Sequence, residues 1–261
     1  MVANNITTID NKGRENTLVG TVLDRKKSNC DVICGEHISK SYGNSLILHD
    51  VSIHVKAGDI YGLIGKNGSG KTTLLRILSG LIPDYGGDIS IDKRTKIAAA
   101  INTPGLFLNM TAYQNMKTQA ALLGLRDDEE IQRTLKNVGI DRYANKIVRD
   151  YSMGMTQRLR ISMALLEKPD VLILDEPVNG LDPDGIADLR NLLHRLNQEQ
   201  GITIIVSSHI LGELEHTATR FGVLHNGVMA KELSLQDIQQ SNTTLETLYM
   251  KYTKGGDNID C

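Results

Sequence analysis

A glycine-rich stretch in the first third of the chain has the residue types and spacing that hold phosphate groups. It consists of Gly65, Lys66, Asn67, Gly68, Ser69, Gly70, Lys71 and Thr72, a complete G-x-x-x-x-G-K-[ST] pattern. The glycines let the backbone fold into a concave nest of N–H donors around an anion. We expect Lys71 to reach the β- and γ-phosphates of a nucleotide and Thr72 to hold Mg²⁺. An ordinary glycine-rich turn is the alternative interpretation.

A second candidate group is a pair of adjacent carboxylates. The apolar run Val171 to Leu174 is typical of a strand buried on both faces, and Asp175 and Glu176 follow it directly. Successive strand residues point to opposite sides, so the two carboxylates can do different work. We expect Asp175 to bind Mg²⁺ through water and Glu176 to accept a proton from attacking water. Alone, the pair is also typical of a simple strand end, but the phosphate loop favours the catalytic interpretation.

The strands and helices expected around the phosphate loop and the carboxylate pair suit these roles. The strand-like run Ile60 to Ile64 precedes the phosphate loop, and a helical run that includes Thr73 follows it, so the helix N-terminus faces the same anion. Further along, strand-like and helical runs alternate, which predicts an α/β fold with a mostly parallel sheet. Residues 1–30 are rich in Asn, Thr and charge and have few large apolar groups, so we expect a disordered tail there.

Four more segments, taken in order with these two, resemble ATP-binding cassette (ABC) proteins. Tyr151-Ser152-Met153-Gly154-Met155 resembles the family's signature, usually Leu-Ser-Gly-Gly-Gln. Gly180-Leu181-Asp182 resembles its D-loop and Ser207-Ser208-His209 its switch histidine, while Tyr42 resembles the aromatic residue that stacks on adenine. The resemblance covers about Val32 to Glu232 and is far more specific than any single motif.

The resemblance implies a P-loop NTPase core with an antiparallel β part near the N-terminus and an inserted helical subdomain. The expected nucleotide-binding domain spans 31–235, its helical subdomain about 103–168, and residues 236–261 form a C-terminal helix and a frayed end. The family also implies a head-to-tail dimer in which each ATP, with Mg²⁺, lies between two subunits. Residues Lys71, Glu176 and His209 would then be catalytic.

In that dimer the resemblance assigns Ser152, Gly154 and Asp182 to the nucleotide of the partner subunit. A helix start near Ser152 can bind the γ-phosphate. Tyr42 would stack on adenine, although a core or surface role is its plainer interpretation. A histidine after a strand, like His209, is also more often a surface residue, and only its place in the motif order favours the catalytic role.

Two departures from the family pattern concern the rate of ATP hydrolysis. Asn102 stands where the family usually has Gln near Mg²⁺, and its amide oxygen sits on a side chain one carbon shorter. Met153 and Met155 replace the usual Gly and Gln of the signature. The segment from Asn102 to Phe107 and the helical end near Leu245 resemble bacitracin- and lantibiotic-type exporters.

This resemblance implies a motor subunit of a membrane exporter of peptide antibiotics, drugs or lipid-like molecules, with bacteriocin or lantibiotic immunity as one possibility. No apolar run reaches the 18 residues of a membrane helix, and the first 30 residues contain no apolar core of signal-peptide length. We therefore expect a peripheral protein on the cytoplasmic face of the membrane. Its expected partners are a polytopic permease that docks near 102–109 and a second ATP-binding subunit, either a copy or a paralogue.

Composition and net charge help to choose between the exporter motor and other functions. The chain has 261 residues, 40% of them hydrophobic, and a formal net charge of −2, which argues against a nucleic-acid partner. A soluble ABC ATPase acting on ribosomes or nucleic acid and an importer motor remain the other candidates.

Of the three cysteines, Cys30 and Cys34 are separated by three residues, and no Cys or His pair at metal spacing joins them. Free thiols are the expectation from sequence.

Overall fold

The structure is a computed structural model that describes residues 4–9, 15–20, 31–101, 105–241 and 243–254. Its strands form two sheets. The five-stranded sheet has the order β2 (Glu15–Gly20), β1 (Asn4–Ile9), β6 (Gly86–Asp92), β3 (Asp31–Tyr42) and β4 (Ser45–Lys56). The six-stranded sheet has the order β11 (Val228–Ser234), β10 (Arg220–His225), β5 (Ile60–Ile64), β9 (Thr203–Ser208), β8 (Val171–Leu174) and β7 (Ile97–Ala100).

The pairing directions confirm the predicted α/β class. Strands β10, β5, β9, β8 and β7 pair in parallel, and only β11 joins that sheet antiparallel. The five-stranded sheet is antiparallel throughout its described pairs. The parallel sheet therefore carries the phosphate loop and the carboxylate pair, while the antiparallel sheet is the β part expected near the N-terminus.

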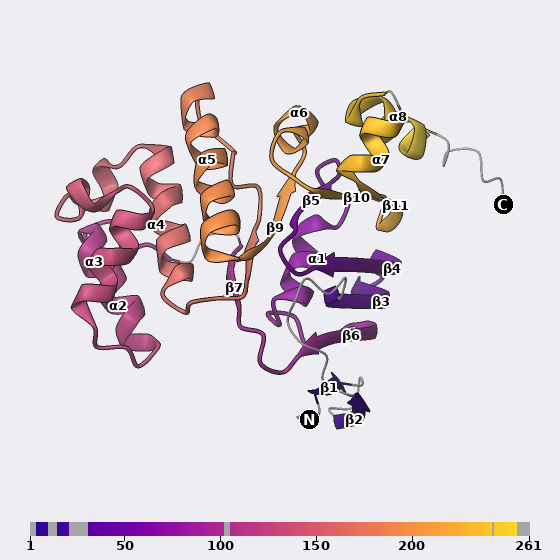
Figure 1. Ribbon diagram of the computed structural model, residues 1–261, viewed down its shortest axis with the longest axis horizontal. Coiled ribbons are helices and arrows are strands. Elements are labelled where there is room, and N and C mark those ends of the chain that lie inside the picture. Colours follow the sequence, from indigo (N-terminus) through magenta and orange to yellow (C-terminus); the bar gives the residue numbers. More distant parts are fainter. Residues whose placement is uncertain (1–3, 10–14, 21–30, 102–104, 242, 255–261) are drawn as a thin grey trace.

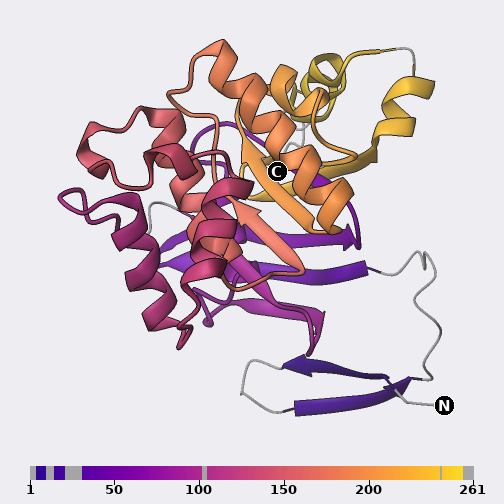
Figure 2. The same cartoon turned by 60° about the vertical axis from the view of Figure 1, so that its left-hand side comes forward.

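Helices gather in separate groups around the sheets (Figure 1). The helices are α1 (Lys71–Leu78), α2 (Ala112–Leu122), α3 (Asp128–Asn137), α4 (Met153–Leu165), α5 (Pro183–Gln200), α6 (Leu211–Glu215), α7 (Leu235–Gln240) and α8 (Leu245–Lys254), with short 3-10 turns at Asp141–Tyr143 and Val148–Asp150. Helices α2, α3 and α4 form a cluster at the left end of the view in Figure 1, and they lie in front of the sheets in Figure 2, where that end comes forward. Within the part of the chain that the structure describes, no helix is long and apolar enough to cross a lipid bilayer.

The central strands bring the candidate residues to one edge. Every residue of β5, β8 and β9 is buried. This matches the continuous apolar run of β8, whereas β9 also buries the polar residues Thr203, Ser207 and Ser208. Burying one such Leu or Ile side chain contributes about 1.5–3 kcal/mol relative to leaving it exposed. Because Ile64 pairs with Ser208 and Leu174 with Val206, the carboxyl ends of three parallel strands meet beside the phosphate loop.

The structure describes two segments within the region expected to be a disordered tail. Residues 4–9 and 15–20 pair as antiparallel strands, and β1 also pairs with β6 of the antiparallel sheet. An edge strand leaves a row of unpaired backbone N–H and C=O groups, and added strands satisfy them. Composition alone does not reveal this, because the pairing partner lies about eighty residues further along the chain. The remaining residues of 1–30 lie outside the described residues.

The C-terminal region contains two helices where one is expected within 236–261. Helix α7 begins at Ser234, whose hydroxyl accepts a hydrogen bond from the Asp237 N–H while the Asp237 carboxylate accepts one from the Ser234 N–H. This reciprocal cap satisfies backbone donors at the start of the helix. The chain leaves the helical conformation after Gln240, and α8 then packs against α6, β10 and β11.

Candidate active site

The phosphate loop joins β5 to α1, and its glycines are required by space and backbone conformation. A Cβ on Gly65 would lie 2.3 Å from the carbonyl oxygen of Leu224. Gly70, the residue that caps α1, has φ 103°, and a Cβ there would lie 2.7 Å from a methyl group of Leu48. The loop is therefore wedged between β10 and β4, and no larger residue fits at these two positions.

The Lys71 ammonium lies inside this loop. It donates hydrogen bonds to the carbonyl oxygens of Gly65 (2.7 Å) and Lys66 (3.2 Å). It also lies 3.1 Å from Oε1 of Glu176, and the lysine side chain is only 5% exposed. The ammonium is thus held at the position where the phosphates are expected, with a carboxylate beside it.

Three side chains and one backbone N–H form a continuous hydrogen-bonded chain from α1 to β9. The Thr72 hydroxyl donates to Oδ2 of Asp175 at 2.7 Å, and the Ser207 hydroxyl donates to Oδ1 of the same carboxylate at 2.7 Å. The Glu176 N–H donates to the Ser207 oxygen at 2.8 Å. Ser207 therefore fixes both carboxylate-bearing residues at the end of β8.

Glu176 is held in a conformation that costs energy. Its φ of 48° is left-handed, which for a residue other than glycine costs on the order of 1 kcal/mol and persists only where neighbours enforce it. Besides Lys71, its carboxylate contacts His209, whose Nδ1 lies 2.8 Å from Oε2. Such strain is common at active sites.

The group fits a magnesium nucleotide. The Ser69 hydroxyl is buried and has no hydrogen-bond partner among the described residues, although an unsatisfied buried hydroxyl costs roughly 1–3 kcal/mol. An anion in the loop would satisfy it. The Thr72 hydroxyl and the Asp175 carboxylate supply the hard oxygen ligands that Mg²⁺ prefers.

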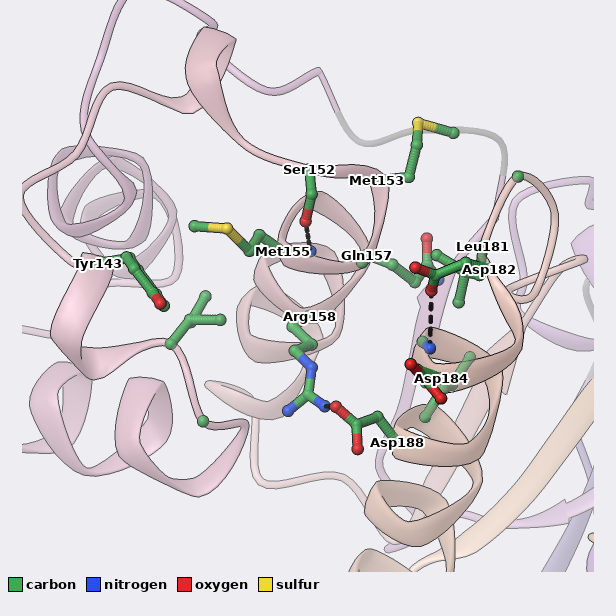
Figure 3. Close-up of a pocket in the computed structure, with 16 residues that line it drawn as sticks. Tyr143, Ser152, Met153, Met155, Gln157, Arg158, Leu181, Asp182, Asp184 and Asp188 are labelled. Atoms are coloured by element: carbon green, nitrogen blue, oxygen red, sulfur yellow. Dashed lines mark hydrogen bonds and ion pairs between the residues drawn. The ribbon is translucent and has the colours of Figure 1, made fainter.

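A second pocket, of about 580 Å³, lies between the segments that follow Tyr151 and Val178 (Figure 3). It is lined by Ser152, Met153, Gly154, Gly180 and Asp182, among others. The Ser152 hydroxyl caps α4 by accepting from the Met155 N–H at 3.3 Å, and the Asp182 carboxylate caps α5 by accepting from the Gly185 N–H at 2.8 Å. Two helix N-termini therefore face this pocket.

The two pockets are separate. Residues Gly65, Lys66 and Asn67 line a different cavity of about 530 Å³ together with His209 and Tyr249. None of these five lines the pocket that contains Ser152. The structure thus divides the predicted site residues between two half-sites of one chain.

Comparison with known proteins decides the family. A protein-family model described as ABC transporter matches residues 48–179. The chain belongs to the ABC transporter family. It is 38% identical over 221 residues to the bacitracin transport ATP-binding protein BcrA of Enterococcus faecalis, covering 81% of this chain and 72% of that protein. It is also 38% identical to the lantibiotic transport ATP-binding protein SrtF of Streptococcus pyogenes, covering 82% and 94%.

Solved structures of ATP-binding cassettes also resemble this chain. The chain resembles an ATP-binding cassette solved as a dimer in a post-hydrolysis state with ADP and Pi, with a TM-score of 0.68, 25% identity and coverage of 78% of this chain and 98% of that one. The comparisons confirm the ABC family and the bacitracin and lantibiotic branch that the sequence resembles. This ABC subunit is an ATPase coupled to transport.

One predicted residue, Tyr42, lines neither of these two pockets. The Tyr42 ring, at the end of β3, is 48% exposed and has the Lys40 ammonium 5.3 Å from its centroid. It does not line the cavity that holds the phosphate loop. Thr73 follows Thr72 on α1. Asn102 lies outside the described residues.

Sequence reasoning missed two contributors to this ABC site. Ser207 was part of the motif that contains His209, but its bridging of Asp175 and Glu176 depends on β8 and β9 being neighbours. Tyr249 of α8 lines the phosphate-loop cavity from the C-terminal region. Burial raises the pKa of its hydroxyl, and a hydrogen bond with the Lys66 backbone opposes that shift. No local pattern marks either role.

Proposed function

We propose that this chain powers export of a peptide antibiotic or of a drug or lipid-like substrate, in a membrane complex that serves resistance or immunity. The observation that carries the motor role is the continuous set of contacts from Thr72 through Asp175 and Ser207 to Glu176. The substrate class rests on the bacitracin and lantibiotic transport proteins that the chain resembles.

In the proposed mechanism the phosphate loop binds ATP and Lys71 leaves Glu176 to pair with the β- and γ-phosphates. The backbone N–H groups and the Ser69 hydroxyl then donate to phosphate oxygens. The freed Glu176 carboxylate accepts a proton from the attacking water. Mg²⁺, held by Thr72 and Asp175, would neutralise charge that develops on the phosphates.

His209 and Ser207 support Glu176 in this mechanism. The contact between the His209 ring and Oε2 orients the carboxylate, and the imidazole is also available to the γ-phosphate. The Ser207 hydroxyl holds the Glu176 backbone while it orients Asp175. We assign adenine stacking to Tyr42, whose exposed ring supports the role, and a weak Mg²⁺ contact to Asn102.

The separate half-sites support a head-to-tail dimer. Ser152 and Gly154 at the N-terminus of α4 would bind the γ-phosphate of the partner subunit's ATP, with Asp182 nearby. Because neither pocket alone surrounds a nucleotide, ATP would close the dimer and hydrolysis would release it. The second subunit is either a copy of this chain or a paralogue.

A surface beside the helical cluster supports docking to a permease. Phe107, Leu108 and Met110 are 51%, 54% and 37% exposed, although each is a large apolar side chain. Exposed apolar residues in sequence proximity are typical of a protein interface. We propose that cytoplasmic helices of a polytopic permease cover this segment, which places the subunit at the cytoplasmic face of the membrane.

Capture in the ATP-bound state tests this function. The tagged Glu176→Gln variant, incubated with ATP in mild-detergent extracts of its native cells, is expected to co-purify with a polytopic membrane protein. The Lys71→Ala variant is the matched control and should capture less, because it lacks the phosphate-binding cation. Ribosomal proteins or nucleic acid in place of a membrane protein would contradict export, and an associated substrate-binding protein would indicate an importer.

A further inference from the structure

Outside the nucleotide site, the antiparallel sheet gathers several side chains that bind metals. Cys34 on β3 and His54 on β4 are directly opposite each other in the sheet register. One ligand atom from each of Asp31, Cys34 and His54 lies within 4.8 Å of the others. Glu36, two residues from Cys34 on the same face of β3, places its Oε1 3.7 Å from the Cys34 sulfur and 2.9 Å from Nε2 of His54.

A carboxylate behind the histidine completes the arrangement. Oε2 of Glu232, on β11, lies 2.7 Å from Nδ1 of His54. Its Oε1 accepts hydrogen bonds from the fully buried Tyr61 hydroxyl (2.7 Å) and from the backbone N–H of His54 (3.0 Å). Glu232 is therefore fixed, and it fixes the imidazole with Nε2 directed at Glu36. Histidines that bind metals commonly have such a carboxylate on the other ring nitrogen.

We propose that Cys34, His54, Glu36 and Asp31 bind one Zn²⁺ ion, with Nε2 as the histidine ligand and Glu232 as the orienting carboxylate. Thiolate, imidazole and carboxylate are the ligands that Zn²⁺ takes in a tetrahedral site. Magnesium is disfavoured because it does not select thiolate. On binding, the Cys34 thiol and any proton on Nε2 release H⁺ to solvent, and Glu36 exchanges its contact with His54 for the metal.

The two contacts of Glu36 are close to the spacing of a tetrahedral zinc site. Zinc–ligand bonds of about 2.0–2.3 Å put tetrahedral ligand atoms about 3.4 Å apart. The Glu36 Oε1 contacts, 3.7 Å to the Cys34 sulfur and 2.9 Å to Nε2 of His54, already lie within about half an ångström of that value. A bound ion would link β3 to β4 and, through Glu232, to β11. The site shares no residue with either nucleotide half-site, so binding should not require ATP.

Sequence spacing hides this site. Cys34 and His54 are twenty residues apart, and Glu232 is far beyond both, so no compact ligand motif appears. The β3–β4 register alone brings the thiol and the imidazole together.

Cobalt titration of the full chain tests the proposal. Metal-free reduced protein is titrated with Co²⁺ while thiolate-to-metal charge transfer and ligand-field absorption are recorded. We expect saturation at one equivalent with tetrahedral ligand-field bands, and loss of both when Zn²⁺ displaces Co²⁺. Absence of a charge-transfer band, or a band that saturates only with nucleotide present, overturns the proposal.

Variants identify the ligands. Cys34→Ser is expected to abolish the charge-transfer band, and His54→Gln the tetrahedral ligand field. Glu232→Gln should weaken Zn²⁺ binding about 10- to 100-fold. His37→Gln is the matched control, because His37 also contacts a carboxylate, Asp50, on the same pair of strands. It should bind metal as the wild type does.

Controls separate ligand loss from misfolding. Each variant must retain the wild-type circular dichroism spectrum and ATP affinity, and Cys34→Ser is the decisive one because it changes a single atom in a half-buried side chain. A charge-transfer band that survives Cys34→Ser, or one that Cys30→Ser or Cys261→Ser removes, shows that another thiol binds the metal and overturns the assignment.

Discussion

The ammonium nitrogen of Lys71 lies 3.1 Å from Oε1 of Glu176, so the phosphate-binding cation and the proposed general base are paired with each other. Both side chains are largely buried, at 5% and 16% exposed. Removing one member of such a pair leaves the other charge poorly solvated. We therefore expect nucleotide binding to replace this ion pair with contacts to phosphate.

Lys71→Ala is expected to abolish ATP binding and to lower the free energy of unfolding by about 1–3 kcal/mol, because Glu176 loses its cation. Adding Glu176→Gln should recover part of that stability without recovering ATP binding. Urea unfolding of the four proteins in a double-mutant cycle measures the coupling. Additive effects of the two substitutions would contradict the pairing.

Ser207→Ala removes the hydroxyl that bridges Asp175 and Glu176. We expect kcat for ATP hydrolysis to fall about tenfold, since small misplacements of catalytic groups are costly, while the Kd for ATP changes little. Ser208→Ala is the matched control, because the Ser208 hydroxyl contacts the Ile210 backbone instead. Steady-state hydrolysis and nucleotide titration separate the two effects, and an unchanged kcat would argue against a positioning role for Ser207.

Ser152 has a structural role as the cap of α4 and a proposed role toward the partner subunit's ATP. Ser152→Ala should lose about 1 kcal/mol of stability and nearly all cooperative hydrolysis. Ser152→Asn retains a capping side chain, so it should keep stability and still lose hydrolysis. Thermal unfolding and ATPase assays distinguish the roles, with ATP binding by the isolated subunit expected to stay intact in both variants. Full hydrolysis by Ser152→Asn would contradict the phosphate contact.

Glu213 offers a pH-dependent prediction. Burial raises the pKa of its carboxyl, while Arg190 and His209 oppose the shift, and Oε2 has no hydrogen-bond partner among the described residues. Because the folded-state pKa is raised, the stabilisation by the protonated form is present below the unfolded pKa and is lost as pH rises through the folded pKa.

Glu213→Gln is therefore expected to be more stable than wild type at pH 7, with the difference shrinking toward pH 4. Urea unfolding at several pH values measures it. Glu246→Gln, which changes an exposed carboxylate, serves as the comparison. A stability difference that stays constant with pH would show that Glu213 ionises in the fold as readily as in the unfolded chain.

Much of the fold is readable from sequence because its signals are local. A complete phosphate-loop pattern and an apolar run ending in Asp175 and Glu176 each lie within one short segment. The start of α7 at Ser234 is equally local, since its cap involves residues three apart. The break between α7 and α8 and the pairing of residues 4–9 with 15–20 are not readable from sequence, because packing and edge pairing decide them.

The sequence by itself determined the family, the phosphate loop, the acidic pair and the alternation that produces a parallel sheet. The tertiary structure decided which of these groups touch. The register of β8 with β9 sets Ser207 between Asp175 and Glu176, and the register of β3 with β4 sets Cys34 opposite His54. The separation of Ser152 from Lys66 of the phosphate loop is likewise a property of the folded chain. Local patterns specify backbone conformation, whereas contacts between distant segments depend on strand order and register, which many residues determine together.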